Sequence, residues 1–233
     1  MVERLRDKVA IIGVGSTTFG EHFDRGYADM IVEAAYEAFE DAAISPSQVE
    51  AAWLGTCFPD SGGYQGNAGA SLADALSLYE APISRVANYC ATGTDAFRNA
   101  CFAVASGAYD LVLVVGAEKM RDVSARESLV GQVAETGHPI LGKGITAPGM
   151  FALFATRYLD RFGVGRQTLA EVAIKNHRHG SLNPKAHFRK EITPEQYFAA
   201  PMIADPLVLW FINSATYDAT RQAAATLVRH RAS

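Results

Sequence analysis

The sequence has few cysteines, and their spacing is typical of neither a disulfide framework nor a metal site. The chain has 233 residues and three cysteines, Cys57, Cys90 and Cys101. A sparse and odd set of this kind is typical of a reducing compartment, because small secreted domains use many cysteines as cross-links. We therefore expect a cytoplasmic protein without a metal site or a disulfide.

The sequence also lacks any apolar run long enough to cross a bilayer, so we expect no membrane span. The first eight residues are mostly charged or polar and lead directly into an apolar segment, whereas a signal peptide has an apolar centre. The formal net charge is −4 and no basic stripe is present, so nucleic acid is not an expected partner.

Apolar residues make up 49% of the chain, which is enough for one domain or for one domain with a large insertion. Between residues 8 and 120, apolar segments typical of strands alternate with segments of helical periodicity. This order predicts right-handed crossovers and an α/β fold with a parallel sheet covered by helices on both faces. We expect strands at 9–15, 50–57, 84–89 and 111–116, and helices at 30–43, 68–78 and 91–106.

Two glycines, Gly13 and Gly15, stand at the end of the first predicted strand. The pattern is not G-x-G-x-x-G, because Thr18 occupies the position of the third glycine. We interpret the pair as a tight turn at a strand end, in preference to a dinucleotide site.

The pattern changes after Met120. Residues 121–149 are polar, irregular or rich in glycine and proline, and helical patterns follow at 150–162 and 169–177. This region resembles an insertion carried on the sheet. The tail from Trp210 onward has weak periodicity and receives no predicted element.

Cys90 stands where an apolar strand ends and a helix begins, a position that favours a reactive thiolate because the helix N-terminus lies nearby. A free cysteine can also be a small buried apolar residue. Position alone leaves both interpretations open for Cys90. The buried interpretation is favoured for Cys101, on the apolar stripe of its helix, and for Cys57, at a strand end.

Several ordered blocks of sequence resemble one family. Residues 88–100 read Asn-Tyr-Cys-Ala-Thr-Gly-Thr-Asp-Ala-Phe-Arg-Asn-Ala, and 114–120 read Val-Val-Gly-Ala-Glu-Lys-Met. They resemble the thiolase superfamily, and most closely the sterol-carrier-protein-2 type thiolases, or acetyl-CoA acetyltransferases. Blocks at 105–110, 146–152, 175–186 and 201–207 match the same subgroup.

The resemblance implies an α-β-α-β-α layered fold and gives Cys90 the role of nucleophile. In the family this cysteine takes the acyl group of acyl-CoA as a thioester, so coenzyme A thioester is a substrate and no cofactor is permanently bound. The resemblance divides the chain into a thiolase half at 1–120, a loop domain for CoA and the acyl group at 121–205, and a divergent or truncated tail at 206–233.

Two loop-domain residues are substrate-binding candidates by resemblance. Met150 falls where the family places a side chain of the acyl pocket, with core packing at a helix start as the alternative. His177 falls in a matching block, where loop-domain structure or contact with CoA is expected. His177 and His179 are two residues apart, which is a poor metal signature on a helix. The Gly-His-Pro at 137–139 imitates a family motif, but we interpret it as a surface turn because it precedes most of the loop-domain match.

The resemblance stops near Leu209. The family continues with a last strand containing Ser-Asp-Gly-Ala-Ala-Ala and then with a second half, which supplies the base for the cysteine. A shifted reading frame, a truncated gene and a divergent tail all stay open. As a thiolase-type enzyme, the chain alone should show weak or absent turnover. The alternatives are a non-catalytic subunit that binds acyl-CoA and a non-functional remnant of a thiolase. Without the second half, apolar surface should be exposed, so we expect self-association, and the resemblance implies a homodimer through residues 64–94. The resemblance also implies a companion acyl-CoA-binding subunit as a possible further partner.

Overall fold

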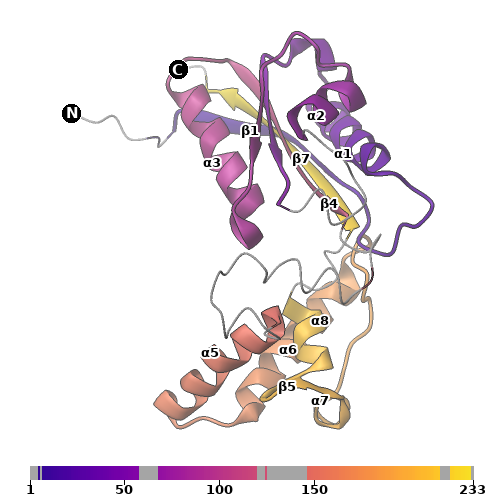
Figure 1. The fold of residues 1–233 in the computed structure, drawn as a ribbon, viewed down its shortest axis with the longest axis vertical. Helices are drawn as coiled ribbons and strands as arrows, with labels where there is room; N and C mark the ends of the chain where they lie inside the picture. The colour runs from indigo at the N-terminus through magenta and orange to yellow at the C-terminus, as the bar shows by residue number, and fades with distance from the viewer. Residues whose placement is uncertain are drawn as a thin grey trace. The chain divides into compact units, whose positions relative to one another are not determined.

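The computed structural model describes residues 5, 7–57, 68–119, 124, 146–215 and 221–231. The chain divides into two units. Unit 1 comprises Met1–Thr17, Glu21–Asp122 and Arg221–Ser233, and unit 2 comprises Thr18–Gly20 and Val123–Thr220. The chain therefore leaves unit 1, builds unit 2, and returns to unit 1 (Figure 1).

Unit 1 is built on a mixed sheet. Its elements are β1 (Val9–Ser16), α1 (Tyr27–Ala42), β2 (Ala51–Gly55), α2 (Ala68–Leu76), β3 (Ile83–Val86), α3 (Thr92–Ala105), β4 (Leu111–Lys119) and β7 (Arg221–His230), with short 3-10 turns η1 (Pro46–Gln48) and η3 (Tyr89–Ala91). In the described part of the chain the sheet has five strands in the order β1-β7-β4-β2-β3. Strands β2, β3 and β4 are parallel, whereas β7 is antiparallel to both of its neighbours, β1 and β4. The four strands predicted between residues 8 and 120 therefore run in the same direction, as expected, and the antiparallel strand β7 comes from the tail, where no element was predicted.

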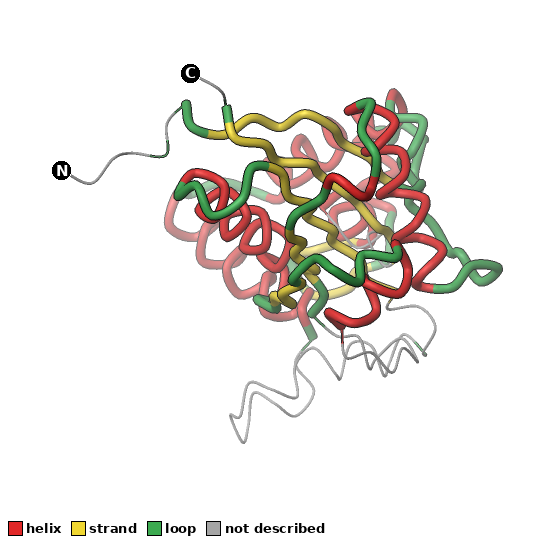
Figure 2. Tube along the Cα trace, turned by 90° about the horizontal axis from the view of Figure 1, so that it is seen from above, coloured by secondary structure: helices red, strands yellow, loops and turns green. Residues whose placement is uncertain are grey.

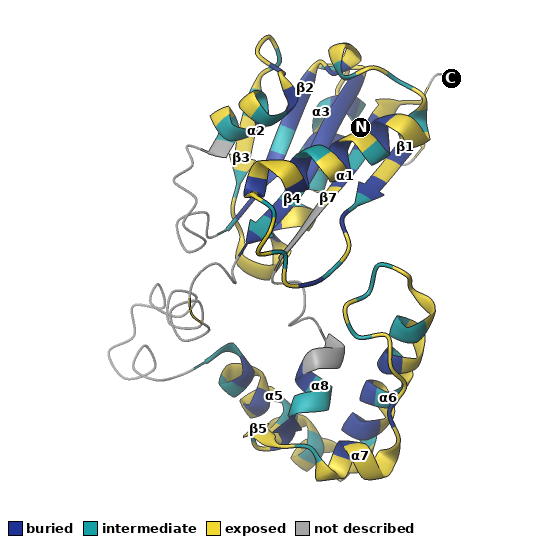
Figure 3. Cartoon of the chain, turned by 90° about the vertical axis from the view of Figure 1, so that its right-hand side faces the viewer, coloured by how far each residue is buried: buried dark blue, intermediate teal, exposed yellow. Residues whose placement is uncertain are grey.

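Helices cover both faces of this sheet, as predicted: α1 and α2 lie on one face and α3 on the other (Figure 1). Strand β4 contributes to both cores, because alternate side chains of a strand point to opposite faces. Leu113 and Val115 pack with α1 and α2, and Val112 and Val114 pack with α3. The burial of β4 from Leu111 onward (Figure 3) confirms the prediction of a central strand.

The glycine pair is not a turn. Gly13 and Gly15 both lie inside β1. A Cβ atom at Gly13 would lie 2.3 Å from the carbonyl oxygen of Ala38, and one at Gly15 would lie 2.1 Å from that of Ala34. The glycines therefore let α1 pack directly against the backbone of β1, which corrects the expectation of a tight turn.

Strand β7 lies in the part of the tail to which the sequence assigned no element. Ala225 and Leu227 are buried on the face that α1 covers, and Val228 is buried on the face of α3. In the sequence, the resemblance ends near Leu209 and does not match the family's last strand to this tail, although β7 contains three consecutive alanines, Ala223, Ala224 and Ala225. Alanine has low strand propensity, so local pattern gives this strand little signal.

Unit 2 is mainly helical. It contains α5 (Ala147–Phe162), α6 (Arg166–Leu182), α7 (Pro194–Ala199), β5 (Met202–Ala204), β6 (Leu207–Val208) and α8 (Leu209–Ala215). The helices expected at 150–162 and 169–177 are thus confirmed, with wider bounds. Figure 2 shows the helices and strands of the described residues along the trace. The core of unit 2 is built around fully buried Tyr197, Ala170, Ala173 and Val208.

The contact between α1 and β1 predicts that Gly15→Ala destabilises the fold much more than Gly116→Ala does. Gly15→Ala should lower the free energy of unfolding by about 1–3 kcal/mol or more, because the added methyl overpacks the interface. Gly116→Ala on β4 is the matched control, since a Cβ there meets nothing within 4 Å. Its effect should stay within about 0.5 kcal/mol. Urea denaturation of the two variants measures this, and equal midpoints would contradict the packing described.

Candidate functional site

Cys90 lies in the connection between β3 and α3. Strand β3 ends at Val86, η3 spans Tyr89–Ala91, and α3 begins at Thr92. The expected position of Cys90 between a strand and a helix is therefore confirmed, but the strand ends at Val86 and not at Tyr89 as predicted. The residue is exposed, so its thiol is accessible from solvent.

The other two cysteines have different surroundings. Cys101 is buried on α3, and burial raises the pKa of its thiol, which keeps it neutral and unreactive. This confirms the expected packing role. Cys57 is half-buried after β2, and its backbone N–H donates to the Glu118 carboxylate with an N–O distance of 2.8 Å.

The turn that carries Cys90 has an unusual backbone. Tyr89 has φ 45°, in the left-handed region that non-glycine residues rarely adopt. Such a conformation costs on the order of 1–3 kcal/mol and persists only where the surroundings hold it. Thr92 supplies two contacts: its Oγ1 accepts the Asn88 backbone N–H at 2.7 Å and donates to the Tyr89 carbonyl at 2.7 Å. The residue directly before Cys90 is therefore held in place by the first residue of α3.

Polar side chains extend this arrangement along α3. Asn88 Nδ2 donates to Asp95 Oδ2 at 3.5 Å, and Asp95 pairs with Arg98 at 2.6 Å. The Asp95 carboxylate lies in the first turn of α3, where a negative charge is favourable beside the helix dipole.

The carboxyl ends of the parallel strands meet at the edge of the sheet that leads to Cys90. Arg85 on β3 donates from Nε to the Thr56 carbonyl and from Nη2 to the Cys57 carbonyl, each at 3.3 Å. Glu118 on β4 receives the Cys57 N–H and, at 3.4 Å, the Thr56 hydroxyl. Ligand sites of open α/β sheets form at this edge. The sequence places Glu118 in a family motif but does not indicate its hydrogen bonds with Thr56 and Cys57, because these residues lie more than 60 positions away in the chain.

The two other candidate residues belong to unit 2. Met150, in the first turn of α5, has 36% of its surface exposed. His177 is buried: its Nδ1 lies 3.2 Å from the Lys190 carbonyl oxygen and its Nε2 lies 3.3 Å from that of Trp210. Partners within unit 2 at both ring nitrogens favour the structural alternative for His177, and its contact with CoA stays a prediction. The Gly-His-Pro at 137–139 lies outside the described residues.

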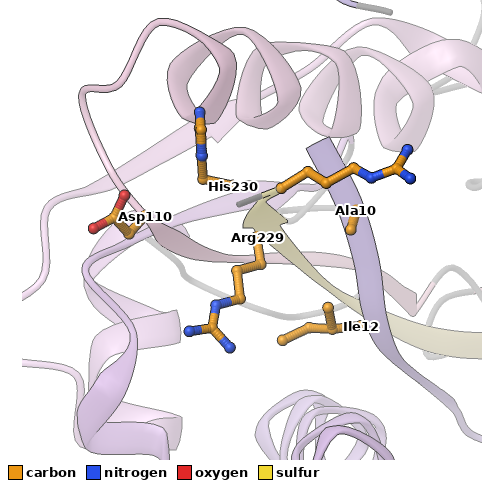
Figure 4. Close-up of a pocket in the computed structure, with 6 residues that line it drawn as sticks. Ala10, Ile12, Asp110, Arg229 and His230 are labelled. Carbon is orange, nitrogen blue, oxygen red and sulfur yellow. The ribbon is translucent and has the colours of Figure 1, made fainter. Parts of the chain in front are cut away.

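A pocket of about 520 Å³ opens elsewhere on unit 1. Its lining residues are Ala10, Ile12, Asp110, Arg229, His230 and Arg231 (Figure 4). It lies where β4 begins and β7 ends, at the opposite edge of the sheet from the Cys90 turn. Arg229 and His230 point in different directions in Figure 4, as neighbours on a strand do. This pocket is therefore separate from the Cys90 site.

Neither a metal-binding cluster nor a membrane-spanning helix is present among the described residues. These residues contain no group of three or more His, Cys, Asp or Glu side chains that could hold a metal ion. Among the same residues, no helix has both the length and the apolar character needed to cross a membrane.

Comparison with known proteins gives the family context. The model of the thiolase N-terminal domain matches residues 9–200. Acetyl-CoA acetyltransferase of Methanothermobacter thermautotrophicus is 37% identical over 205 residues, which cover 88% of this chain and 53% of the relative. Sterol carrier protein 2 of Bos taurus is 30% identical over 219 residues, covering 88% of this chain and 39% of the relative. The chain thus spans about half or less of these relatives.

Solved structures show the same fold. The structure described as Ltp2-ChsH2(DUF35) aldolase has a TM-score of 0.76 at 24% identity, covering 97% of this chain and 56% of that chain. A monomeric SCP2-thiolase like protein type 1 from Mycobacterium smegmatis has a TM-score of 0.68 at 19% identity, covering 97% of this chain and 46% of that chain. At these identities the likeness concerns fold alone, and it confirms the thiolase-like fold class.

Proposed function

Because the chain belongs to the thiolase family, we propose that Cys90 accepts the acyl group of an acyl-coenzyme A as a thioester. The observation that carries this proposal is an exposed cysteine in a held turn directly before α3. A relative named acetyl-CoA acetyltransferase supports a coenzyme A thioester as substrate.

The chemical step is a thioester exchange. The Cys90 thiolate attacks the carbonyl carbon of the acyl-CoA, forming a new S–C bond and a tetrahedral oxyanion. Collapse of this intermediate breaks the C–S bond to coenzyme A, which leaves as a thiolate and takes up a proton from solvent. The N-terminus of α3 begins two residues after Cys90 and favours negative charge on the oxyanion that forms there.

A second candidate function differs in the chemistry at Cys90. In this alternative the chain is a thiolase-like subunit that binds acyl-CoA and does not turn it over. The two candidates differ in whether a covalent adduct forms at Cys90, so one measurement separates them.

We also propose that Met150 contacts the acyl group. Its partial exposure at the start of α5 leaves the side chain available to a ligand. His177 is buried, so we assign it an indirect contribution, the shape of unit 2. The proposed contact of Met150 predicts that Met150→Ala needs a higher acetyl-CoA concentration than the parent chain for half-maximal acylation. The control variant His179→Ala should need the same concentration as the parent chain.

The proposed partners follow from the edge of the sheet. Strand β3 ends the strand order and has one neighbour in the described sheet, β2, so its other side can pair with a second copy of the chain.

The name Ltp2-ChsH2(DUF35) shows that one structural neighbour was solved with a companion protein, and we propose a comparable acyl-CoA-binding companion here. A cytoplasmic location is proposed because the chain has only three cysteines, Cys57, Cys90 and Cys101, and a sparse, odd set of this kind is typical of a reducing compartment.

The proposed homodimer through residues 64–94 can be tested by the sedimentation of the chain. The chain at low micromolar concentration should sediment as a dimer, because pairing at β3 covers unpaired backbone groups. Analytical ultracentrifugation measures this, and a clean monomer across the concentration range would exclude the proposed pairing.

Incubation with acetyl-CoA should add the mass of one acetyl group to the intact chain. The adduct should be absent from Cys90→Ala and present in Cys57→Ala, because only the Cys90 thiol lies in the turn before α3. Intact-mass spectrometry of the three proteins makes this measurement. An adduct that persists in Cys90→Ala would refute the nucleophile, and measurable CoA binding without any adduct would favour the binding subunit.

A further inference from the structure

We infer that Thr92 is a positioning residue for Cys90, an inference that rests on the proposed acylation at that cysteine. The described contacts give Thr92 a task distinct from ordinary helix packing. Its hydroxyl joins the chain segment before the thiol to the helix after it.

The hydroxyl uses both of its hydrogen-bonding capacities on the same turn. Oγ1 accepts the N–H of Asn88 and donates its proton to the carbonyl of Tyr89, each at 2.7 Å. A hydroxyl has one proton to donate and lone pairs that accept, so the two bonds form together without competition. They lie on the two sides of the Tyr89 α-carbon and fix the backbone that leads into Cys90.

The residue so held is the one that needs holding. Tyr89 has φ 45°, and a bulky side chain in this region relaxes unless neighbouring contacts prevent it. If Tyr89 relaxed to an ordinary conformation, the direction of the chain into Cys90 would change. The Thr92 hydroxyl therefore controls where the thiol points.

The methyl group of Thr92 ties this turn to the sheet. Thr92 is buried, and a Cβ atom at Gly55, the last residue of β2, would lie 3.3 Å from Thr92 Cγ2. The side chain is thus packed at the end of the parallel strands while its hydroxyl holds the turn. Two substitutions separate these contributions: Thr92→Val keeps the shape and removes the hydroxyl, and Thr92→Ser keeps the hydroxyl and removes the methyl.

The test compares these two variants by three measurements. Thr92→Val should lower the rate of Cys90 acylation by acetyl-CoA about 10- to 100-fold, because a small misplacement of a reacting group has effects of that size. Thr92→Ser should stay within about threefold of the parent chain, since its hydroxyl still forms both bonds. Hydrogen exchange at the Asn88 amide should be fast in Thr92→Val and slow in the parent and in Thr92→Ser. Alkylation of buried Cys101 by iodoacetamide reports general opening of α3 and should stay unchanged.

Each outcome decides one question. Parent-like acylation and slow Asn88 exchange in Thr92→Val would overturn the inference, and so would equal losses in the Ser and Val variants. A rise in Cys101 alkylation that parallels the loss would also overturn it, because the effect would then be general unfolding. If the parent chain forms no acyl adduct, the proposed function fails. The exchange rates at Asn88 then still show whether Thr92 holds the turn.

Discussion

The insertion of β7 between β1 and β4 is the constraint on which unit 1 depends. Without it, β1 has no neighbour in the described sheet, and the face that α1 covers loses Ala225 and Leu227. The antiparallel ladders on both sides of β7 also bring the chain back from unit 2 into unit 1. Residues about 100 positions away from β4 in the sequence thereby join β1 to the rest of the sheet.

The parallel pairing of β2 with β3 and with β4 brings the carboxyl ends of these three strands together, and the candidate site lies there. Glu118 and Arg85 bind backbone groups that follow β2, and Thr92 packs at the last residue of that strand. Cys90 itself is exposed, but the residues on either side of it in the turn and the helix are tied to the sheet. An accessible thiol on a fixed backbone is the arrangement that an acyl-transfer nucleophile requires.

Much of unit 1 could be predicted from the sequence because its elements have strong periodicity. The apolar run of β4 and the helical stripe of α3, with Ala96, Ala100 and Val104, lie where the pattern placed them. Strand β7 could not be predicted from pattern, because its alanines favour no strand and its burial depends on partners far away in sequence. The glycines of β1 were misinterpreted for the same reason, since their purpose is the close approach of α1.

The candidate site was predictable only in its central residue. Local sequence and family resemblance both identify Cys90, but they do not indicate the left-handed φ of Tyr89 or the two bonds of Thr92. These depend on backbone geometry that no residue pattern specifies. The burial of His177 likewise depends on carbonyl groups 13 and 33 positions further along the chain.

The central claim is that the Cys90 thiol becomes covalently acylated, and a protection measurement tests it most directly. The chain is treated with acetyl-CoA, freed of unbound ligand, and exposed to iodoacetamide before peptide mass mapping. Cys90 should escape alkylation after treatment with acetyl-CoA. Hydroxylamine, which cleaves thioesters, should make Cys90 open to alkylation again. Alkylation of Cys90 at the same rate with and without acetyl-CoA would contradict the account.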